Sequence, residues 1–313
     1  MNDTATEISR RKAWLMAARP HTLPAAAAPV IVGVGFALHE GLFAPLPALA
    51  ALVGAALIQV GTNFANDYYD AVKGVDTDER TGFTRVTQSG LISPSKVKQA
   101  MYGTFLLAIV VGVYLVYVGG LPILVIGLAS VVSGIAYAGG PFPLGSNGLG
   151  DLFVFVFFGV IAVMGTFYVQ AAQILAAPFS IGIPGGTVTM HAFLASLPVA
   201  AISTNILVVN NIRDLKNDRK AGKRTLAVLI GYRASRGEYV GMLALAYLVP
   251  VYFATTEAFG VGVLLPLLTI PYAAMVARTV LTKTSGEALN PALEQTGKLL
   301  AAYSVCFALG MVA

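Results

Sequence analysis

Apolar runs separated by short charged zones dominate the pattern of this chain. The Lys and Arg residues fall in four zones, at residues 10–19, 73–98, 213–236 and 278–298. The stretches between these zones carry no basic residue and cover residues 20–72, 99–212 and 237–277. A helix needs roughly 20 apolar residues to cross the hydrocarbon core of a bilayer. The three stretches are therefore long enough for two, four and two spans, and one more span follows the last zone.

The pattern predicts an all-α polytopic membrane protein with nine transmembrane helices. Glycine and proline break the apolar runs at Gly119-Gly120, at residues 139–145 and in the uncharged loop 173–190. Because the segment after Gly120 is interrupted, eight spans is the alternative. We expect one transmembrane domain over residues 1–313, with residues 1–20 as a short cytoplasmic N-terminal segment. The predicted spans cover roughly residues 22–38, 46–65, 100–118, 121–138, 151–172, 191–209, 237–254, 261–280 and 297–313.

Composition and charge agree with a membrane protein and set its expected orientation. Hydrophobic residues make up 57% of the chain and charged residues 11%, whereas a soluble domain carries about 25% charged residues. The single cysteine excludes a disulfide framework. Because Lys and Arg near span ends stay in the cytoplasm, we expect the N-terminus inside and the C-terminus outside a cell (inner) membrane. The lipid bilayer is an expected partner, and nucleic acid is not.

A weak internal repeat relates the two halves of the chain. The second and sixth predicted spans both end in Asn-x-x-x-Asp, at Asn66 and Asp70 and again at Asn210 and Asp214. The two copies lie four spans apart, which predicts two related four-helix units plus one extra helix around a central cavity. Membrane folds of this kind commonly form their sites between the repeats.

Carboxylates recur at helical spacing at the cytoplasmic ends of the same two spans. Asp70 follows Asn66 by four residues and Asp67 by three, and Asp218 follows Asp214 by four, so each group lies on one helix face and includes a pair of carboxylates. Like charges at this spacing repel each other unless they share a cation. Oxygen ligands suit Mg²⁺, which is commonly held by one or two carboxylates plus substrate phosphates. Basic residues in the adjoining loops can bind an anion, so we predict a Mg²⁺-diphosphate site with a lipid tail between the helices.

Two Asp-rich motifs carry a family resemblance. They are Asn66-Asp67-Tyr68-Tyr69-Asp70, followed by Gly74-Val75-Asp76-Thr77-Asp78, and Asp214-x-x-x-Asp218. With residues 18–24, 137–151 and 210–227, these motifs resemble the UbiA superfamily of intramembrane aromatic prenyltransferases, most closely its naphthoate-prenylating branch. Asp76 follows Asp70 by six residues, where many members place the third aspartate four residues on, and Asp78 is a rival to Asp76.

The resemblance implies a Mg²⁺-dependent enzyme of menaquinone biosynthesis. Its reaction transfers a polyprenyl chain from polyprenyl diphosphate to 1,4-dihydroxy-2-naphthoate, with loss of CO₂ and pyrophosphate, and gives demethylmenaquinol. The implied Mg²⁺ ligands are Asn66, Asp67, Asp70, Asp76, Asp214 and Asp218. The implied catalytic residues are Asp67, Asp70, Asp214, Asp218 and Tyr137.

Other residues are expected to bind the substrates. The implied substrate-binding residues are Asn66, Tyr69, Lys73, Arg80, Arg85, Asn210, Lys216 and Arg224. Among these, the basic side chains are candidates for the phosphate oxygens. Tyr69 and Tyr137 offer aromatic faces, which can stabilise an allylic cation. Asp151 follows Gly150 at the start of a helix, where stabilisation by the helix dipole is the expected role.

Two alternatives remain open at this stage. The first keeps the fold and changes the acceptor to 4-hydroxybenzoate, homogentisate or a tetrapyrrole, because the pocket shape that selects the acceptor is not visible in the sequence. The second is an ion-coupled transporter, for which inverted repeats and acidic residues near the bilayer midplane are expected. In this chain the acidic residues cluster at one face, which favours the enzyme.

Overall fold

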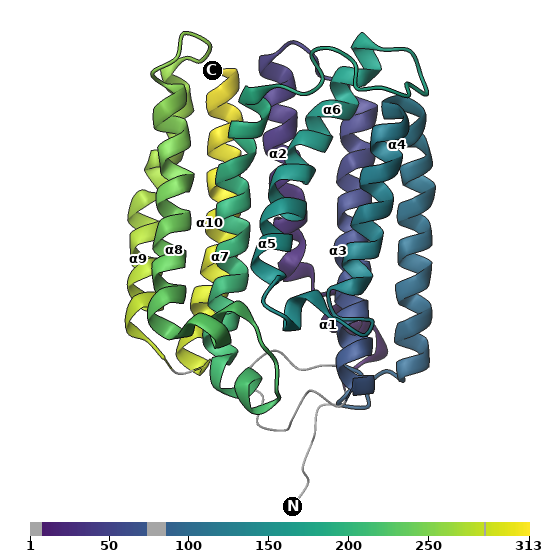
Figure 1. Cartoon of the computed structure of the whole chain (residues 1–313), viewed down its shortest axis with the longest axis vertical. Coiled ribbons are helices and arrows are strands. Elements are labelled where there is room, and N and C mark those ends of the chain that lie inside the picture. Colours follow the sequence, from purple (N-terminus) through teal and green to yellow (C-terminus); the bar gives the residue numbers. More distant parts are fainter. Residues whose placement is uncertain (1–7, 74–85, 285) are drawn as a thin grey trace, which may run out of the picture.

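The computed structural model describes residues 8–73, 86–284 and 286–313, and these residues form helices and connecting turns without any strand (Figure 1). Apolar runs with small residues favour helices here, since a bilayer offers no partner for open backbone groups. In chain order the helical elements are α1 (Arg10–Ala18), η1 (Pro20–Thr22), α2 (Leu23–His39), α3 (Pro45–Lys73), α4 (Pro94–Ala136), η2 (Leu144–Ser146), α5 (Gly150–Val154), η3 (Phe155–Ile161), α6 (Ala162–Leu175), α7 (Met190–Lys220), α8 (Leu226–Phe253), η4 (Val261–Thr269), α9 (Ile270–Thr282) and α10 (Gly286–Val312).

The helix α4 contains the break predicted at Gly119-Gly120. Gly120 has a φ of 71° and a ψ of −157°, so the backbone turns there and α4 forms two arms. A Cβ at Gly120 would lie 1.9 Å from the carbonyl oxygen of Ser180, which leaves room for glycine alone. The amide of Leu121 donates to that same oxygen at 2.9 Å. The loop after α6 is thereby docked on the turn of α4.

The predicted span 151–172 is one helical stretch with a π-helical centre. It consists of α5, the π-helix η3 and α6. Gly159 in η3 lies against Ala200 of α7, where an added Cβ would come within 2.1 Å of the Ala200 Cβ. The widened turn and the glycine together let the two backbones approach closely. Such π segments recur at functional sites.

Several helices are suited to cross a bilayer, so the chain is a multi-pass membrane protein. Within the described residues, six helical stretches meet the length and hydropathy of a span, and they begin at Arg10, Pro45, Pro94, Gly150, Met190 and Val261. The predicted spans 237–254 and 297–313 coincide with α8 and α10, which lie outside these six. The count of nine membrane spans therefore stays a prediction.

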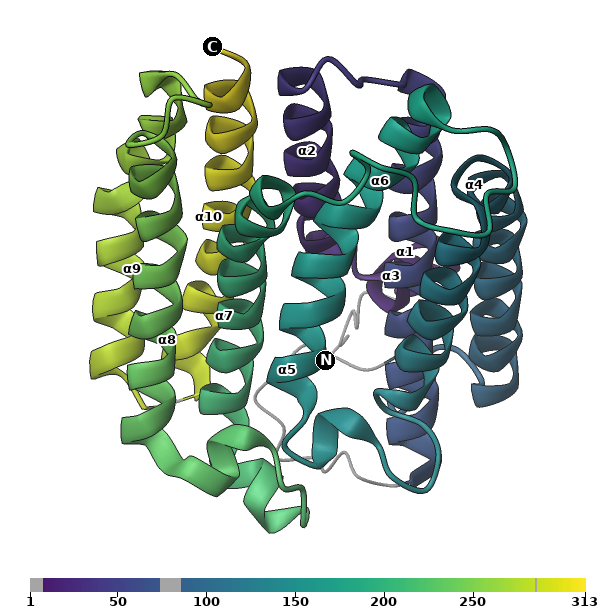
Figure 2. The same cartoon turned by 45° about the horizontal axis from the view of Figure 1, so that its top comes forward.

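The C-terminal helix α10 lies between α2 and the second half of the chain. It packs against α2, α7 and η4, and Leu299, Tyr303 and Phe307 on it are fully buried. The Tyr303 hydroxyl donates to the carbonyl oxygen of Ala246 in α8. The helix that we expected as an addition to two four-helix units thus joins α2 to the second half of the chain (Figure 2).

The described parts of the basic zones gather at one end of the bundle. The C-terminal ends of α3, α7 and α9 lie there together with the N-terminal ends of α4, α8 and α10, at the lower end of Figure 1. The chain's C-terminus lies at the opposite end. This arrangement brings both predicted Asp-rich motifs to the same end of the molecule.

Candidate active site

A stripe of polar side chains at helical spacing runs along α3 and consists of Gln59, Asn63, Asn66 and Asp70. The stripe divides into two groups with different partners. Gln59 and Asn63 face the N-terminal segment. Gln59 donates to the Thr22 hydroxyl at 2.9 Å, and Asn63 donates to the same hydroxyl at 3.0 Å and to the Ala18 carbonyl at 2.9 Å. Thr22 in turn donates to the Arg19 carbonyl at 2.9 Å. These contacts hold the N-terminal segment on α3 and account for the upper part of the stripe structurally.

The first motif presents Asn66, Asp67 and Asp70 at the lower end of α3. Asp67 is 1% exposed, and its Oδ2 accepts hydrogen bonds from the Thr87 hydroxyl at 2.5 Å and the Thr87 amide at 3.2 Å. Asp67 therefore fixes the chain where it enters α4. Asn66 differs, because its buried Oδ1 has no hydrogen-bond partner among the described residues. Asp70 is half-buried.

In the second motif, a buried arginine organises Asn210 and Asp214. The Arg213 guanidinium donates to both carboxylate oxygens of Asp214, at 2.8 and 2.6 Å, and to Asn210 Oδ1 at 2.7 Å. It also donates to Asn290 Oδ1 of α10 at 3.2 Å. Planar two-point pairing of this kind fixes the orientation of a carboxylate. Arg213 and Asn290 are thus parts of the site that the motif spacing did not indicate.

Asp218 has a partner of its own on the loop after α7. The Lys223 ammonium lies 3.6 Å from Asp218 Oδ1, and the Lys223 amide donates to the Asp218 carbonyl at 2.9 Å. The Arg224 amide donates to the Ser146 carbonyl at 2.9 Å, which joins this loop to the loop before α5. The side chains of Lys216 and Arg224 are exposed. Lys223 is therefore a basic residue beside Asp218, as Arg213 is beside Asp214.

Tyr137 marks the point where the two motifs approach each other. The sequence placed it in the predicted span 121–138, but the helical stretch that meets the length and hydropathy of a span ends one residue earlier, at Ala136, and Tyr137 is the residue that caps it. Burial raises the pKa of its hydroxyl, and the carboxylates of Asp151, Asp70 and Asp218 raise that pKa further. The phenol consequently stays protonated at neutral pH and can donate a hydrogen bond. One side chain thus lies within electrostatic reach of a carboxylate from each motif.

Glycines shape the loop around Tyr137. A Cβ at Gly145 would lie 2.8 Å from the Tyr137 ring, and one at Gly150 would lie 3.3 Å from its hydroxyl. The Gly145 amide donates to the Tyr137 carbonyl at 3.0 Å. Asp151, which lies in the first turn of α5 as expected, accepts a 3.5 Å hydrogen bond from Asn211. The glycine- and proline-rich segment therefore packs closely around the Tyr137 phenol.

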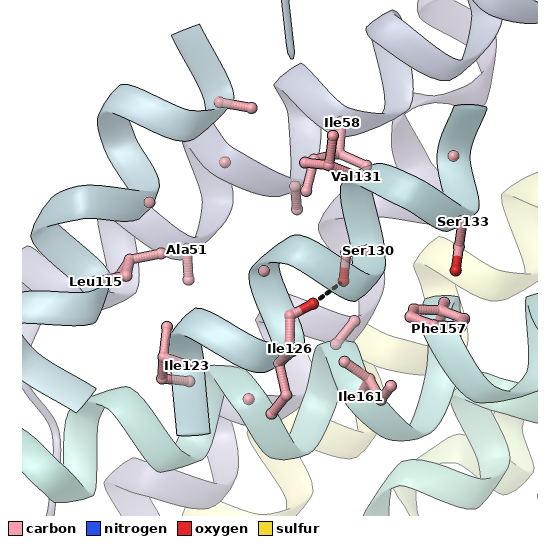
Figure 3. A pocket seen from close by; sticks show the side chains of 18 of the residues that line it. Ala51, Ile58, Leu115, Ile123, Ile126, Ser130, Val131, Ser133, Phe157 and Ile161 are labelled. Carbon is pink, nitrogen blue, oxygen red and sulfur yellow. Dashed lines mark hydrogen bonds between the residues drawn. The ribbon is translucent and has the colours of Figure 1, made fainter. Parts of the chain in front are cut away.

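An apolar cavity of about 360 Å³ begins at Tyr137 and extends between α2, α3, both arms of α4, and the α5–α6 stretch. Ile58, Ile123, Ile126 and Ile161 are among the residues that line it (Figure 3). Phe153 and Phe157 also line it, with ring centroids 5.6 Å apart and planes 15° apart. The cavity is suited to hold a hydrocarbon chain away from water. The end of the cavity at Tyr137 is the end nearer the aspartates.

Of the remaining predicted site residues, the structure places Tyr69 and leaves several others outside the residues it describes. Tyr69 packs edge-on against Tyr68, with ring centroids 5.0 Å apart, and lies against Gly139. The predicted residues Asp76, Arg80 and Arg85, and the rival Asp78, lie outside the described residues, as does the side chain of Lys73.

The donor set can be tested against a divalent cation. Within the described part of the chain, no three His, Cys, Asp or Glu side chains lie close enough to hold a metal together. The unpartnered Asn66 Oδ1 is, however, an oxygen donor one helical turn from Asp70. The available ligands are all oxygens, which suits a hard cation such as Mg²⁺. The residues present therefore fit the predicted metal.

Comparisons with known proteins bear on the site. The profile of the UbiA prenyltransferase family matches residues 26–300. The chain is 36% identical to the 1,4-dihydroxy-2-naphthoate octaprenyltransferase of Escherichia coli K12, over 98% of the chain and 97% of that protein. It is 35% identical to the protein of that name from Mycobacterium tuberculosis, over 94% of the chain and 95% of the relative.

A solved structure shares the fold. The UbiA homologue from Archaeoglobus fulgidus bound to DMAPP and Mg²⁺ superposes with a TM-score of 0.61, over 94% of this chain and 98% of that one, at 17% identity. At this identity the likeness shows the fold alone. The helical arrangement of this chain is thus the fold of that UbiA homologue.

Proposed function

Since the chain belongs to the UbiA prenyltransferase family, we propose that it transfers a polyprenyl group from polyprenyl diphosphate to 1,4-dihydroxy-2-naphthoate. The ring carboxylate leaves as CO₂, pyrophosphate is released, and the product is demethylmenaquinol, a precursor of menaquinone. The two relatives named 1,4-dihydroxy-2-naphthoate octaprenyltransferase align with this chain over nearly their whole length, which supports the choice of acceptor. Their names specify an octaprenyl group.

One observation carries the proposal. Tyr137 lies within electrostatic reach of Asp70 from the first motif and Asp218 from the second, whose carboxylates raise the pKa of its hydroxyl after burial and Asp151, and it also lines the apolar cavity. A prenyl diphosphate needs this combination, because its head carries negative charge and its tail is hydrocarbon. The position of Tyr137 therefore supports a diphosphate at the motifs and a prenyl chain in the cavity.

The metal ligands that we propose are Asn66, Asp70, Asp214 and Asp218, with Asp67 and Asp76 in support. When bound, Mg²⁺ would neutralise the negative charge that develops on the departing pyrophosphate. The unpartnered Asn66 Oδ1 supports this assignment. Asp67 has a second task, since its Oδ2 holds Thr87. A bound divalent cation is also named for the structural homologue from Archaeoglobus fulgidus.

The chain's own side chains supply binding, orientation and exclusion of water. We assign Lys73, Arg80, Arg85, Lys216 and Arg224 to the diphosphate, and add Lys223 because it lies beside Asp218. Asn210 helps to orient the second motif through Arg213. The protonated Tyr137 can donate to the leaving oxygen, and its ring, with that of Tyr69, can face the allylic cation. An apolar cavity keeps water from that cation.

The proposed placement in the cell follows from the charge distribution. The described parts of the basic zones lie at one end of the bundle, and Lys and Arg near spans stay in the cytoplasm. We therefore place the N-terminus and both Asp-rich loops in the cytoplasm, and the C-terminus outside the cell (inner) membrane. The domain proposed for residues 1–313 is a single one.

The test is an acceptor panel with purified protein in detergent, Mg²⁺ and a radiolabelled polyprenyl diphosphate. We expect label in a prenylated product with 1,4-dihydroxy-2-naphthoate and background with 4-hydroxybenzoate or homogentisate. Product from 4-hydroxybenzoate alone would overturn the assignment of the acceptor. The relatives reported above carry prenyltransferase names, so the transporter alternative gains no support from them.

A further inference from the structure

Hydroxyl groups in the cavity wall fall into two classes. Besides Tyr137, the wall contains four hydroxyl side chains, from Thr62, Ser130, Ser133 and Thr166. Ser130 donates to the Ile126 carbonyl at 2.8 Å, and Thr166 donates to the Ala162 carbonyl at 2.7 Å. These two hydroxyls satisfy their own helices, as Ser and Thr in helices often do.

The other two hydroxyls make no hydrogen bond within the described residues. Thr62 is 9% exposed, and its buried Oγ1 is unpartnered. The Ser133 hydroxyl points from α4 towards Phe157 (Figure 3). Ser133 is half-buried, whereas the Thr62 hydroxyl is buried without a partner in an apolar wall, which is unfavourable and calls for an explanation. A polar group on a bound ligand supplies one.

The positions of Thr62 and Ser133 are related. A Cβ at Gly134 would lie 2.8 Å from Thr62 Oγ1, so Thr62 meets α4 beside Ser133. Thr62 precedes Asn66 by four residues, and Ser133 precedes Tyr137 by four. Four residues of α-helix rise roughly 6 Å. Both hydroxyls therefore lie about one helical turn deeper in the bundle than Asn66, a proposed metal ligand, and Tyr137, the proposed donor to the leaving oxygen.

An aromatic wall completes this part of the cavity. Phe153 and Phe157 line it with nearly parallel rings, and Phe157 lies opposite Ser133 in Figure 3. Aromatic faces pack well against a flat fused-ring ligand. The described wall here thus combines apolar faces with two unpartnered hydroxyls.

We propose that Thr62 and Ser133 bind the ring hydroxyls of the aromatic acceptor, while Phe153 and Phe157 hold its fused rings. This inference rests on the proposed function and adds the residues that select the acceptor. A pocket built to bond a substrate hydroxyl strongly rejects an analogue that lacks it, because its own polar groups are then left unpaired. The two hydroxyls thus favour a dihydroxylated ring over a ring with one hydroxyl.

The test compares Thr62→Val and Ser133→Ala with two matched controls, Thr166→Val and Ser130→Ala. Each control removes a hydroxyl from the same cavity wall, but one that is bonded within its own helix. The Michaelis constants for 1,4-dihydroxy-2-naphthoate and for the polyprenyl diphosphate are measured separately. We expect the naphthoate KM to rise about 5- to 10-fold in the two test variants, as for one lost hydrogen bond each, with the diphosphate KM and kcat unchanged.

A second measurement uses 1-hydroxy-2-naphthoate as a competitive ligand. Its inhibition constant should rise by a smaller factor than the KM for 1,4-dihydroxy-2-naphthoate in at least one test variant. The reason is that this ligand lacks the second ring hydroxyl, so one of the two proposed hydrogen bonds is already absent. Equal effects in test and control variants would overturn the proposal. A rise confined to the diphosphate KM would also overturn it, because the hydroxyls would then face the prenyl donor. If the wild type makes no naphthoate product, the proposed function itself fails, and that result is distinct from both.

Discussion

Arg213 offers a direct test of how the second motif is held. Its side chain is 2% exposed, and that of its partner Asp214 is 14% exposed. The guanidinium donates two hydrogen bonds to Asp214 and one each to Asn210 and Asn290. Removing one partner of a buried ion pair costs about 3–5 kcal/mol. We therefore expect Arg213→Ala to lower the free energy of unfolding by about that amount.

The conservative variant Arg213→Lys separates charge from geometry. A lysine keeps the positive charge but lacks the planar fork that bonds both Asp214 oxygens. We expect it to keep part of the stability and still weaken binding of a divalent cation by about 10- to 100-fold, as is typical when a group that orients a metal ligand is lost. The readouts are denaturant unfolding in mixed micelles, followed by circular dichroism, and Mn²⁺ binding, followed by electron paramagnetic resonance.

Lys298→Ala serves as the matched control. Lys298 also pairs with a carboxylate on α10, Glu294, at 2.7 Å, but both side chains are largely exposed. Exposed pairs contribute little to stability, so unfolding and Mn²⁺ binding should match the wild type. If Arg213→Ala unfolds like Lys298→Ala and binds Mn²⁺ with wild-type affinity, Arg213 does not hold the motif and the reasoning is refuted.

Three further predictions address other parts of the account. Gly120→Ala should lower the melting temperature, because its Cβ would meet Ser180 and its φ is positive. Gly103→Ala lies inside a helix with open space around it and should leave the melting temperature unchanged or raise it slightly, since alanine favours a helix over glycine. Equal melting temperatures of the two variants would contradict the docked loop. Thr87→Val should destabilise the fold by about 1–3 kcal/mol, since it removes one hydrogen bond to buried Asp67. It should weaken Mn²⁺ binding less than Arg213→Lys does, because Asp67 is proposed only as a supporting ligand. A loss of affinity as large as that of Arg213→Lys would contradict this supporting role. Chelation by EDTA should abolish prenyl transfer, and added Mg²⁺ should restore it; turnover that persists in EDTA would exclude a required divalent cation.

The sequence predicted the elements of this fold better than the contacts within its site. Hydrophobic runs located the helices, and Gly119-Gly120 located the turn of α4, because apolar length and glycine act locally. The position of α10 was not predicted in the same way. Its buried face meets α2 and α7, and such contacts depend on tertiary packing that periodicity alone does not reveal.

Within the site, spacing identified the carboxylates but not the residues that orient them. Asp67 and Asp70 look equivalent in sequence, yet Asp67 is bonded to Thr87, 20 residues away. Arg213 looks like one more basic residue in a charged zone, but it is buried against Asn290 of the last helix. The members of each pair lie far apart in the chain, so no local sequence pattern predicts the contact between them. The unpartnered oxygens of Asn66 and Thr62 likewise become apparent only once the helices are packed.

The central claim is that the two Asp-rich motifs act together on a prenyl diphosphate at the mouth of the apolar cavity. Mass spectrometry of the product from 1,4-dihydroxy-2-naphthoate, polyprenyl diphosphate and Mg²⁺ tests it most directly, with wild type, Asp70→Asn and Asp214→Asn side by side. We predict a decarboxylated, prenylated product from the wild type and none above background from either variant. Wild-type yields from both variants, with their folding intact, would contradict the claim.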